Sequence, residues 1–257
     1  MVADYPMIEE DEAVGRVAAV YGAALERAPF VPSLLKSLAL CPQYLLLAWD
    51  QASAVLDETE FRQAASRLGA MVEDAATPPA DVHDRELIGA FVGPLGRMLL
   101  LSCGLLASLE GNLAGRAPAT DPRVAPPRAP LQAALPDVRQ LTAHAPVLGR
   151  IRLKLDTPIV NSVWRKAAAE GRLETVWEHL EPQAPRTRER ADALQDAAIS
   201  AAVDLPWKGV ADRSALRAMG VEDAEPGVRA ILRAYVTTLP RVLTLVASCG
   251  PADDDQG

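Results

Sequence analysis

The residue types that most often carry chemistry are sparse in this chain and share no catalytic spacing. The histidines and cysteines lie at His83, His144, His179, Cys41, Cys103 and Cys249. None of them belongs to a CxxC motif or to the short spacings of a zinc site, and no glycine-rich loop of the form GxGxxG or GxxxxGKS/T occurs. We therefore expect neither a metal site nor an organic cofactor.

Four basic residues stand in largely apolar stretches. Lys36 and Arg165 either hold a ligand carboxylate through charge-assisted hydrogen bonds or are solvated cations on a helix surface. Arg97 and Arg241 lie among leucines, and a buried guanidinium needs a partner. We expect each of this second pair to form an ion pair with an acid, in preference to binding a ligand.

Two polar residues lie at expected helix starts, close to prolines. Asn161 follows Pro158 and precedes the stretch SVW (162–164), and Ser33 follows Pro32. Asn and Ser are preferred N-cap residues, so each is interpreted either as a helix cap or as a polar group facing a cleft. Asp156 is a less favoured candidate for a catalytic base beside Asn161.

Helices must position these side chains. The chain has 257 residues, of which 49% are apolar and only 4% aromatic, and no run of alternating Val, Ile and Thr offers material for a sheet. The fold class is therefore predicted to be all-α. The formal charge of −8 argues against a nucleic-acid partner, which needs a concentrated basic face.

Apolar periodicity and prolines divide the chain into helical segments. We expect a helix over 13–27, two short helices over 33–56 with Pro42 between them, a helix over 59–74, and a pair over 81–110 interrupted at Gly93-Pro94. Helical patterning stops in the proline-rich segment 115–136 and resumes at Asp137, a plausible N-cap. The predicted units are an N-terminal helical repeat (1–114), a linker (115–136) and a C-terminal helical repeat with a disordered acidic tail (137–257).

The two units resemble each other. The stretch FVPSLLK (30–36) matches IVNSVWR (159–165), and AFVGPLGRMLLL (90–101) matches AYVTTLPRVLTL (234–245). Because the two matches occur in the same order on either side of the linker, we interpret the chain as a tandem duplication that forms a pseudo-dimer around a pseudo-twofold axis.

A cleft between two such repeats is a natural place for a small ligand. Equivalent segments face the same axis, so the segments 30–33, 92–94 and 159–161 are expected to line one cavity. The predicted site residues are Asn161 as the catalytic position and Phe30, Pro32, Ser33, Val92, Gly93, Ile159 and Val160 as substrate-binding positions.

The sequence resembles the group I 2-haloacid dehalogenase family over most of its length. The segments that carry the resemblance are PQYLLLAW (42–49), Ala90-Phe91 followed by MLLL (98–101), and the strip around Pro158. The resemblance implies an all-helical fold built from two related repeats, with the active site between them. It also implies hydrolysis of 2-haloalkanoic acids without metal or organic cofactor.

In that family an aspartate activates the water that displaces halide at C2, with inversion and without a covalent ester. The family's Pro-x-x-Asp corresponds here to Pro158-Ile-Val-Asn161, so the catalytic position holds an amide that accepts no proton at pH 7. The Asn-Tyr pair that follows Ala-Phe in the family is Val92-Gly93 here. The resemblance therefore implies an inherited cleft with altered chemistry.

Two functions from different classes follow. The chain is either a hydrolytic relative of the 2-haloacid dehalogenases that acts on small 2-halocarboxylic acids, or a non-hydrolytic small-carboxylate-binding or interaction protein that keeps the fold. A small carboxylic acid is the expected partner, with no membrane partner. The N-terminus has no signal-peptide pattern, so a cytoplasmic location is expected.

Overall fold

The computed structural model describes residues 5–73, 81–113, 124–207 and 211–248. In these ranges the chain forms helices joined by turns and contains no strand, which confirms the predicted all-α class. The predicted disordered tail and the start of the predicted linker lie outside the described residues. The described part of the linker, residues 124–136, is without helix.

Helices in the first half of the chain follow the predicted segments closely. They are α1 (Gly15–Leu25), α2 (Ser33–Leu38), α3 (Pro42–Ser53), α4 (Thr59–Glu73), α5 (Val82–Gly89) and α6 (Val92–Leu109). Pro42 is the first residue of α3, where its missing N–H costs no hydrogen bond. Asp81 caps α5 by accepting a hydrogen bond from the Asp84 amide.

The described part of the second half is also helical. After two 3₁₀ turns, η1 (Val138–Gln140) and η2 (Thr142–His144), come α7 (Ala145–Leu155), α8 (Ser162–Ala169), α9 (Leu173–Leu180), η3 (Ala184–Arg186), α10 (Arg188–Val203), α11 (Arg213–Ala218), η4 (Glu222–Ala224) and α12 (Glu225–Ala247). Asp137 caps η1 in a capping box with Gln140, so it starts this half as predicted.

One predicted helix break is wrong. The sequence placed the interruption between the two helices of residues 81–110 at Gly93-Pro94, whereas α5 ends at Gly89 and Gly93-Pro94 lies in the first turn of α6. A proline in the first turn lacks only an N–H that has no helical partner, so it marks the start of this helix rather than a break.

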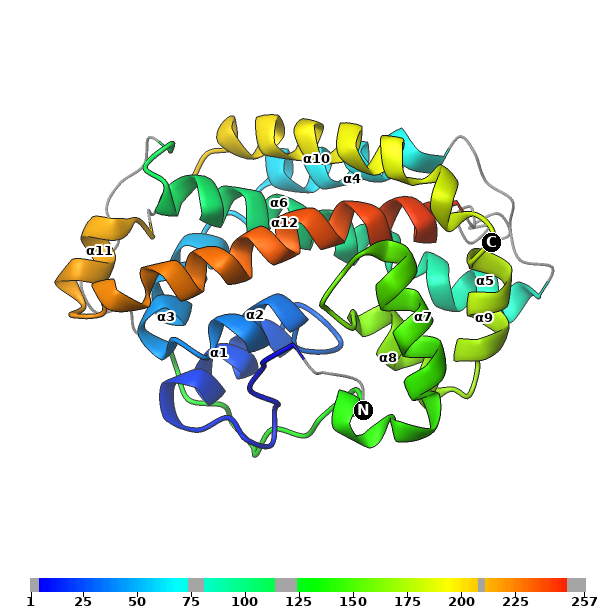
Figure 1. The fold of residues 1–257 in the computed structure, drawn as a ribbon. Coiled ribbons are helices and arrows are strands. Elements are labelled where there is room, and N and C mark those ends of the chain that lie inside the picture. The colour runs from blue at the N-terminus through cyan, green and yellow to red at the C-terminus, as the bar shows by residue number, and fades with distance from the viewer. Residues whose placement is uncertain (1–4, 74–80, 114–123, 208–210, 249–257) are drawn as a thin grey trace.

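The centre of the molecule is the pair α6 and α12, which run side by side (Figure 1). The helices α4 and α10 cover one side of this pair, and the shorter helices α1–α3 and α7–α9 lie on the other side (Figure 1). The helical stretches Val82–Leu109 and Glu222–Ala247 are long and apolar enough to cross a membrane, but 61% and 72% of their most apolar windows are buried inside the protein. Their apolar side chains form the core of this fold.

Segments that match in sequence between the two halves also meet each other. The helices α6 and α12, which carry the second sequence match, are in contact, and Ser33 and Ser162, which share a place in the first match, form a hydrogen bond. A tandem repeat around a twofold axis would give both contacts. The duplication itself stays a prediction, and superposition of 10–112 on 137–250 tests it.

Among the glycines that the structure describes, Gly104 in α6 leaves the least room for a side chain. A Cβ built on Gly104 would lie 2.0 Å from Cζ2 of Trp207, whose indole is fixed by its Nε1–H donating to the Ala202 carbonyl at 2.6 Å. We expect Gly104→Ala to lower the free energy of unfolding by about 1–3 kcal/mol, because a fixed ring must move. Chemical denaturation measures this, with Gly149→Ala as control, since a Cβ there meets nothing within 4 Å. Equal effects of the two substitutions would contradict the contact.

Candidate functional site

A cavity of about 510 Å³ opens between the α1–α2 loop, α3, α6 and the start of α8. Four of the predicted site residues line it, namely Phe30, Pro32, Ser33 and Asn161. The first strip and Asn161 come from different halves of the chain. The structure therefore brings the first strip and Asn161 together at one site.

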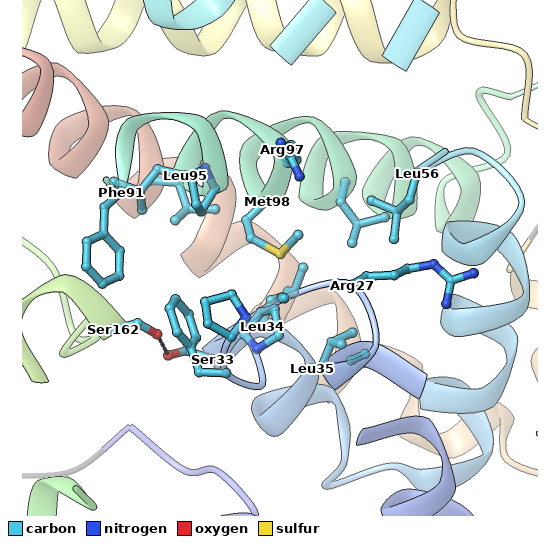
Figure 2. A pocket seen from close by; sticks show the side chains of 18 of the residues that line it. Arg27, Ser33, Leu34, Leu35, Leu56, Phe91, Leu95, Arg97, Met98 and Ser162 are labelled. Carbon is cyan, nitrogen blue, oxygen red and sulfur yellow. Dashed lines mark hydrogen bonds between the residues drawn. The ribbon is translucent and has the colours of Figure 1, made fainter. Parts of the chain in front are cut away.

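The inner end of the cavity is polar. Ser33 begins α2 and Ser162 begins α8, and their hydroxyl oxygens lie 3.1 Å apart in a hydrogen bond (Figure 2). Two hydroxyls that share one hydrogen bond keep one hydrogen for another acceptor. Ser162 also places the N-terminus of α8 at the cavity, where backbone N–H groups and the helix dipole favour an anion.

Asn161 is the N-cap residue of α8, but its side chain does not cap the helix. The residue is only 3% exposed and lines the cavity. Its Nδ2 atom is buried and has no hydrogen-bond partner among the described residues. A buried donor without a partner costs free energy, and this one belongs to a residue that lines the cavity.

Tyr235 of α12 also lines the cavity. Its hydroxyl lies 3.0 Å from Oγ of Ser37, and the side chain is buried. Burial raises the pKa of Tyr235 above its ordinary value, with a smaller opposing effect of the Ser37 hydrogen bond. The phenol is thus neutral at physiological pH and offers no base to the site.

The middle of the cavity is apolar. Phe30 and Phe91 stack with ring centroids 5.6 Å apart, and both line the wall. Leu34, Leu35 and Met98 lie beyond them, between the serine pair and Arg27 (Figure 2). This wall suits the hydrocarbon part of a ligand.

The mouth of the cavity is charged. Arg27 donates to Asp57 at 3.3 Å and lies 5.7 Å from the ring centre of Trp49. Arg62 and Arg97 also line the mouth. Among the described lining residues the only carboxylates are Glu26 and Asp57, and both are exposed, so the polar inner end contains no carboxylate.

Four predicted substrate-binding residues do not line this cavity. Ile159 and Val160 are 0% and 3% exposed and belong to the hydrophobic core, because the backbone before α8 turns their side chains inward. Val92 packs partly against the core and Gly93 faces solvent in the first turn of α6. Pro94 and Leu95 of the same turn line the cavity in their place.

Both interpretations of Lys36 and Arg165 are wrong. Each side chain is buried, and neither lines the cavity. Lys36 Nζ donates to Glu9 at 2.6 Å and to Glu10 at 2.5 Å, and Arg165 donates to the same Glu9 oxygen at 2.9 Å and to the Pro136 carbonyl at 2.7 Å. We call Glu9, Glu10, Lys36 and Arg165 the buried charge cluster.

The other charged candidates, Arg241, Asp156 and Arg97, do not form one site. Arg241 donates to the main-chain carbonyl of Leu155 at 3.0 Å and to the Asp156 carboxylate at 3.1 Å, as expected for a paired arginine. This contact and the exposed side chain of Asp156 remove it from the cavity and from the role of base. Arg97 is exposed at the cavity mouth and forms no ion pair with the residues that the structure describes, so the expected ion pair of Arg97 is not found there.

Sequence reasoning missed the other polar and charged residues of the cavity. Arg27, Arg62, Ser162 and Tyr235 were not proposed as site residues. Two of them carried a usable signal, because Ser162 matches Ser33 and Tyr235 matches Phe91 in the aligned halves. Arg27 and Arg62 had no such signal, since nothing local in the sequence distinguishes them from other surface arginines.

No protein-family model and no curated protein matches the sequence. Solved structures do match over nearly the whole chain. A D-2-haloacid dehalogenase mutant in complex with D-2-CPA is similar at a TM-score of 0.77, with 17% identity, covering 98% of this chain and 97% of that one. The chain has the fold of the D-2-haloacid dehalogenases.

Two further solved structures have a similar fold. A D-2-haloacid dehalogenase mutant gives a TM-score of 0.76 at 17% identity, again over 98% of this chain and 97% of that chain. A D-2-haloacid dehalogenase in complex with L-LA gives 0.74 at 18% identity, over 98% of both chains. Identity at this level establishes the dehalogenase-like fold alone, and function must be argued from the site.

Proposed function

We propose that the protein binds a carboxylic acid in this cavity and does not hydrolyse it. The observation that carries the proposal is Asn161, which lines the cavity and whose amide nitrogen is buried without a hydrogen-bond partner among the described residues. A carboxylate oxygen accepts from such a donor, from the serine pair and from the N-terminus of α8. The stacked Phe30 and Phe91 then contact the hydrocarbon part.

The absence of a base at the inner end supports binding over hydrolysis. Displacement of halide by water needs a proton acceptor within hydrogen-bond reach of that water. Asn161 orients a water molecule but accepts no proton, and the described carboxylates of the cavity lie at the exposed mouth. The second candidate function, hydrolysis of a 2-halocarboxylic acid of the group I type, is favoured by the fold shared with dehalogenases.

Calorimetric titration tests the binding proposal. We expect 2-chloropropionate to bind and the neutral 2-chloropropionamide to bind more weakly, because the site provides donors for a charged acceptor. Asn161→Ala removes a donor to a charged group, which is worth about 10- to 100-fold in affinity. Asn112→Ala, at an exposed position just after α6 that does not line the cavity, is the control and leaves affinity unchanged.

Thermal unfolding of the same variants keeps the result interpretable. Nδ2 of Asn161 has no partner among the described residues, so its removal is expected to leave the melting temperature unchanged or slightly higher. A folded Asn161→Ala protein that binds the acid as tightly as the native chain would contradict the proposal.

A further inference from the structure

Three arginines line the mouth of the cavity in an otherwise acidic protein of net charge −8. Arg62 on α4 and Arg97 on α6 are exposed, and neither side chain forms an ion pair or a hydrogen bond with the described residues. Arg27 already pairs with Asp57 at 3.3 Å. The mouth therefore has two arginine side chains that have no ion-pair partner among the described residues.

These arginines and the polar inner end belong to one elongated cavity. Arg27 and the Ser33–Ser162 pair lie at opposite ends of the lined space, with Met98 and Leu34 between them (Figure 2). The volume of about 510 Å³ falls within the range of pockets that enclose drug-sized ligands. A halopropionate at the inner end would leave the apolar middle and the mouth unfilled.

We propose that the ligand carries two anionic groups on an apolar spacer, as an α,ω-dicarboxylic acid does. The inference rests on the proposed binding of one carboxylate at Asn161. The spacer lies along Phe30, Leu34 and Met98, and the second carboxylate meets Arg62 and Arg97 at the mouth. Exposed arginines suit this second group, because the end of a long ligand that protrudes to the mouth stays partly solvated.

Titration with matched ligands tests the second anionic group. Octanoate and suberate have the same carbon number but one and two carboxylates, and the series from succinate to sebacate varies the spacer. An exposed ion pair contributes about 0.2–1 kcal/mol, which corresponds to at most about a fivefold gain per arginine. We expect suberate to bind about fivefold more tightly than octanoate, with the best affinity at an intermediate length and a smaller advantage at high salt.

Arginine variants assign the effect to the mouth. Arg62→Gln and Arg97→Gln should remove the advantage of the dicarboxylate and leave octanoate affinity unchanged. Arg67→Gln, an exposed arginine of the same α4 that does not line the cavity, is the control and should change neither. All three positions are exposed, so the variants should fold normally.

Failure of this inference is distinguishable from failure of the proposed function. If octanoate binds in an Asn161-dependent way but suberate binds no more tightly, the second anionic group is wrong. If the suberate advantage survives in the Arg62→Gln/Arg97→Gln double variant, the arginines are not its partners. If no carboxylate binds, the proposed function is wrong, and the inference of a second anionic group is wrong as well.

Discussion

Replacing Arg165 by Met should lower the free energy of unfolding by about 3–5 kcal/mol, because it breaks the buried charge cluster. Arg165 and Lys36 are 0% and 1% exposed and balance the charges of Glu9 and Glu10. Removing the guanidinium leaves two buried carboxylates facing one ammonium group. Chemical denaturation with linear extrapolation measures the change.

Lys166→Met is the matched control. Lys166 is the next residue along α8, and its ion pair with Glu170 at 2.8 Å is partly solvated, with 43% of the lysine side chain exposed. Such a pair contributes about 0–1 kcal/mol, so the control should change stability little. Similar losses in the two variants would contradict the account of a buried cluster.

The same cluster predicts a dependence on pH. Burial alone would raise the pKa of Glu9, but the hydrogen bonds and charges of Arg165 and Lys36 outweigh burial and hold it below its ordinary value of 4.5. Because the folded pKa is lower than the unfolded one, this stabilisation is present above about pH 4.5 and is lost as the pH falls through the folded pKa. The Arg165→Met protein should lose less stability over this acidic window than the native chain.

The second large effect concerns catalysis. We expect the native protein to release little or no halide from either enantiomer of 2-chloropropionate at neutral pH, because a missing general base costs about 10²–10⁴-fold in rate. Asn161→Asp supplies a carboxylate at the place that the resemblance assigns to the base. We expect only a small gain, because misplacement alone costs about 10²-fold and the new charge repels the ligand carboxylate.

Halide release by the native protein, Asn161→Asp and the exposed control Asn112→Asp decides between the two candidate functions. Rapid turnover by the native protein would contradict the binding account and favour a dehalogenase that uses another base. Turnover restored in full by Asn161→Asp would show that the cavity still positions substrate for hydrolysis, which would also contradict the proposed place of the ligand carboxylate.

The sequence predicted local features well and long-range partners poorly. Pro42, Asp137 and the apolar stripes are local signals, and they placed the helices close to where the structure has them. Gly93-Pro94 misled because a proline is compatible with the first helical turn as well as with a break. The meeting of Phe30–Ser33 with Asn161 at one cavity was predicted from the sequence match between FVPS (30–33) and IVNS (159–162).

Lys36 and Arg165 show why the rest was not predictable. Their burial depends on Glu9 and Glu10, which lie in an acidic N-terminal stretch that resembles a solvated segment and has no periodic relation to either helix. The orientation of side chains before a helix is equally non-local. Ile159 and Val160 point into the core while the adjacent Asn161 reaches the cavity, and only the packed structure decides between these directions.

A crystal structure of the protein with a bound carboxylate tests the central claim most directly. Crystals soaked with 2-chloropropionate and, separately, with octanoate should show a carboxylate oxygen about 3 Å from Nδ2 of Asn161, within hydrogen-bond reach of the Ser33–Ser162 pair. The hydrocarbon part should lie against Phe30 and Phe91. A carboxylate bound only at the arginines of the mouth, with Nδ2 of Asn161 still unpartnered, would contradict the account.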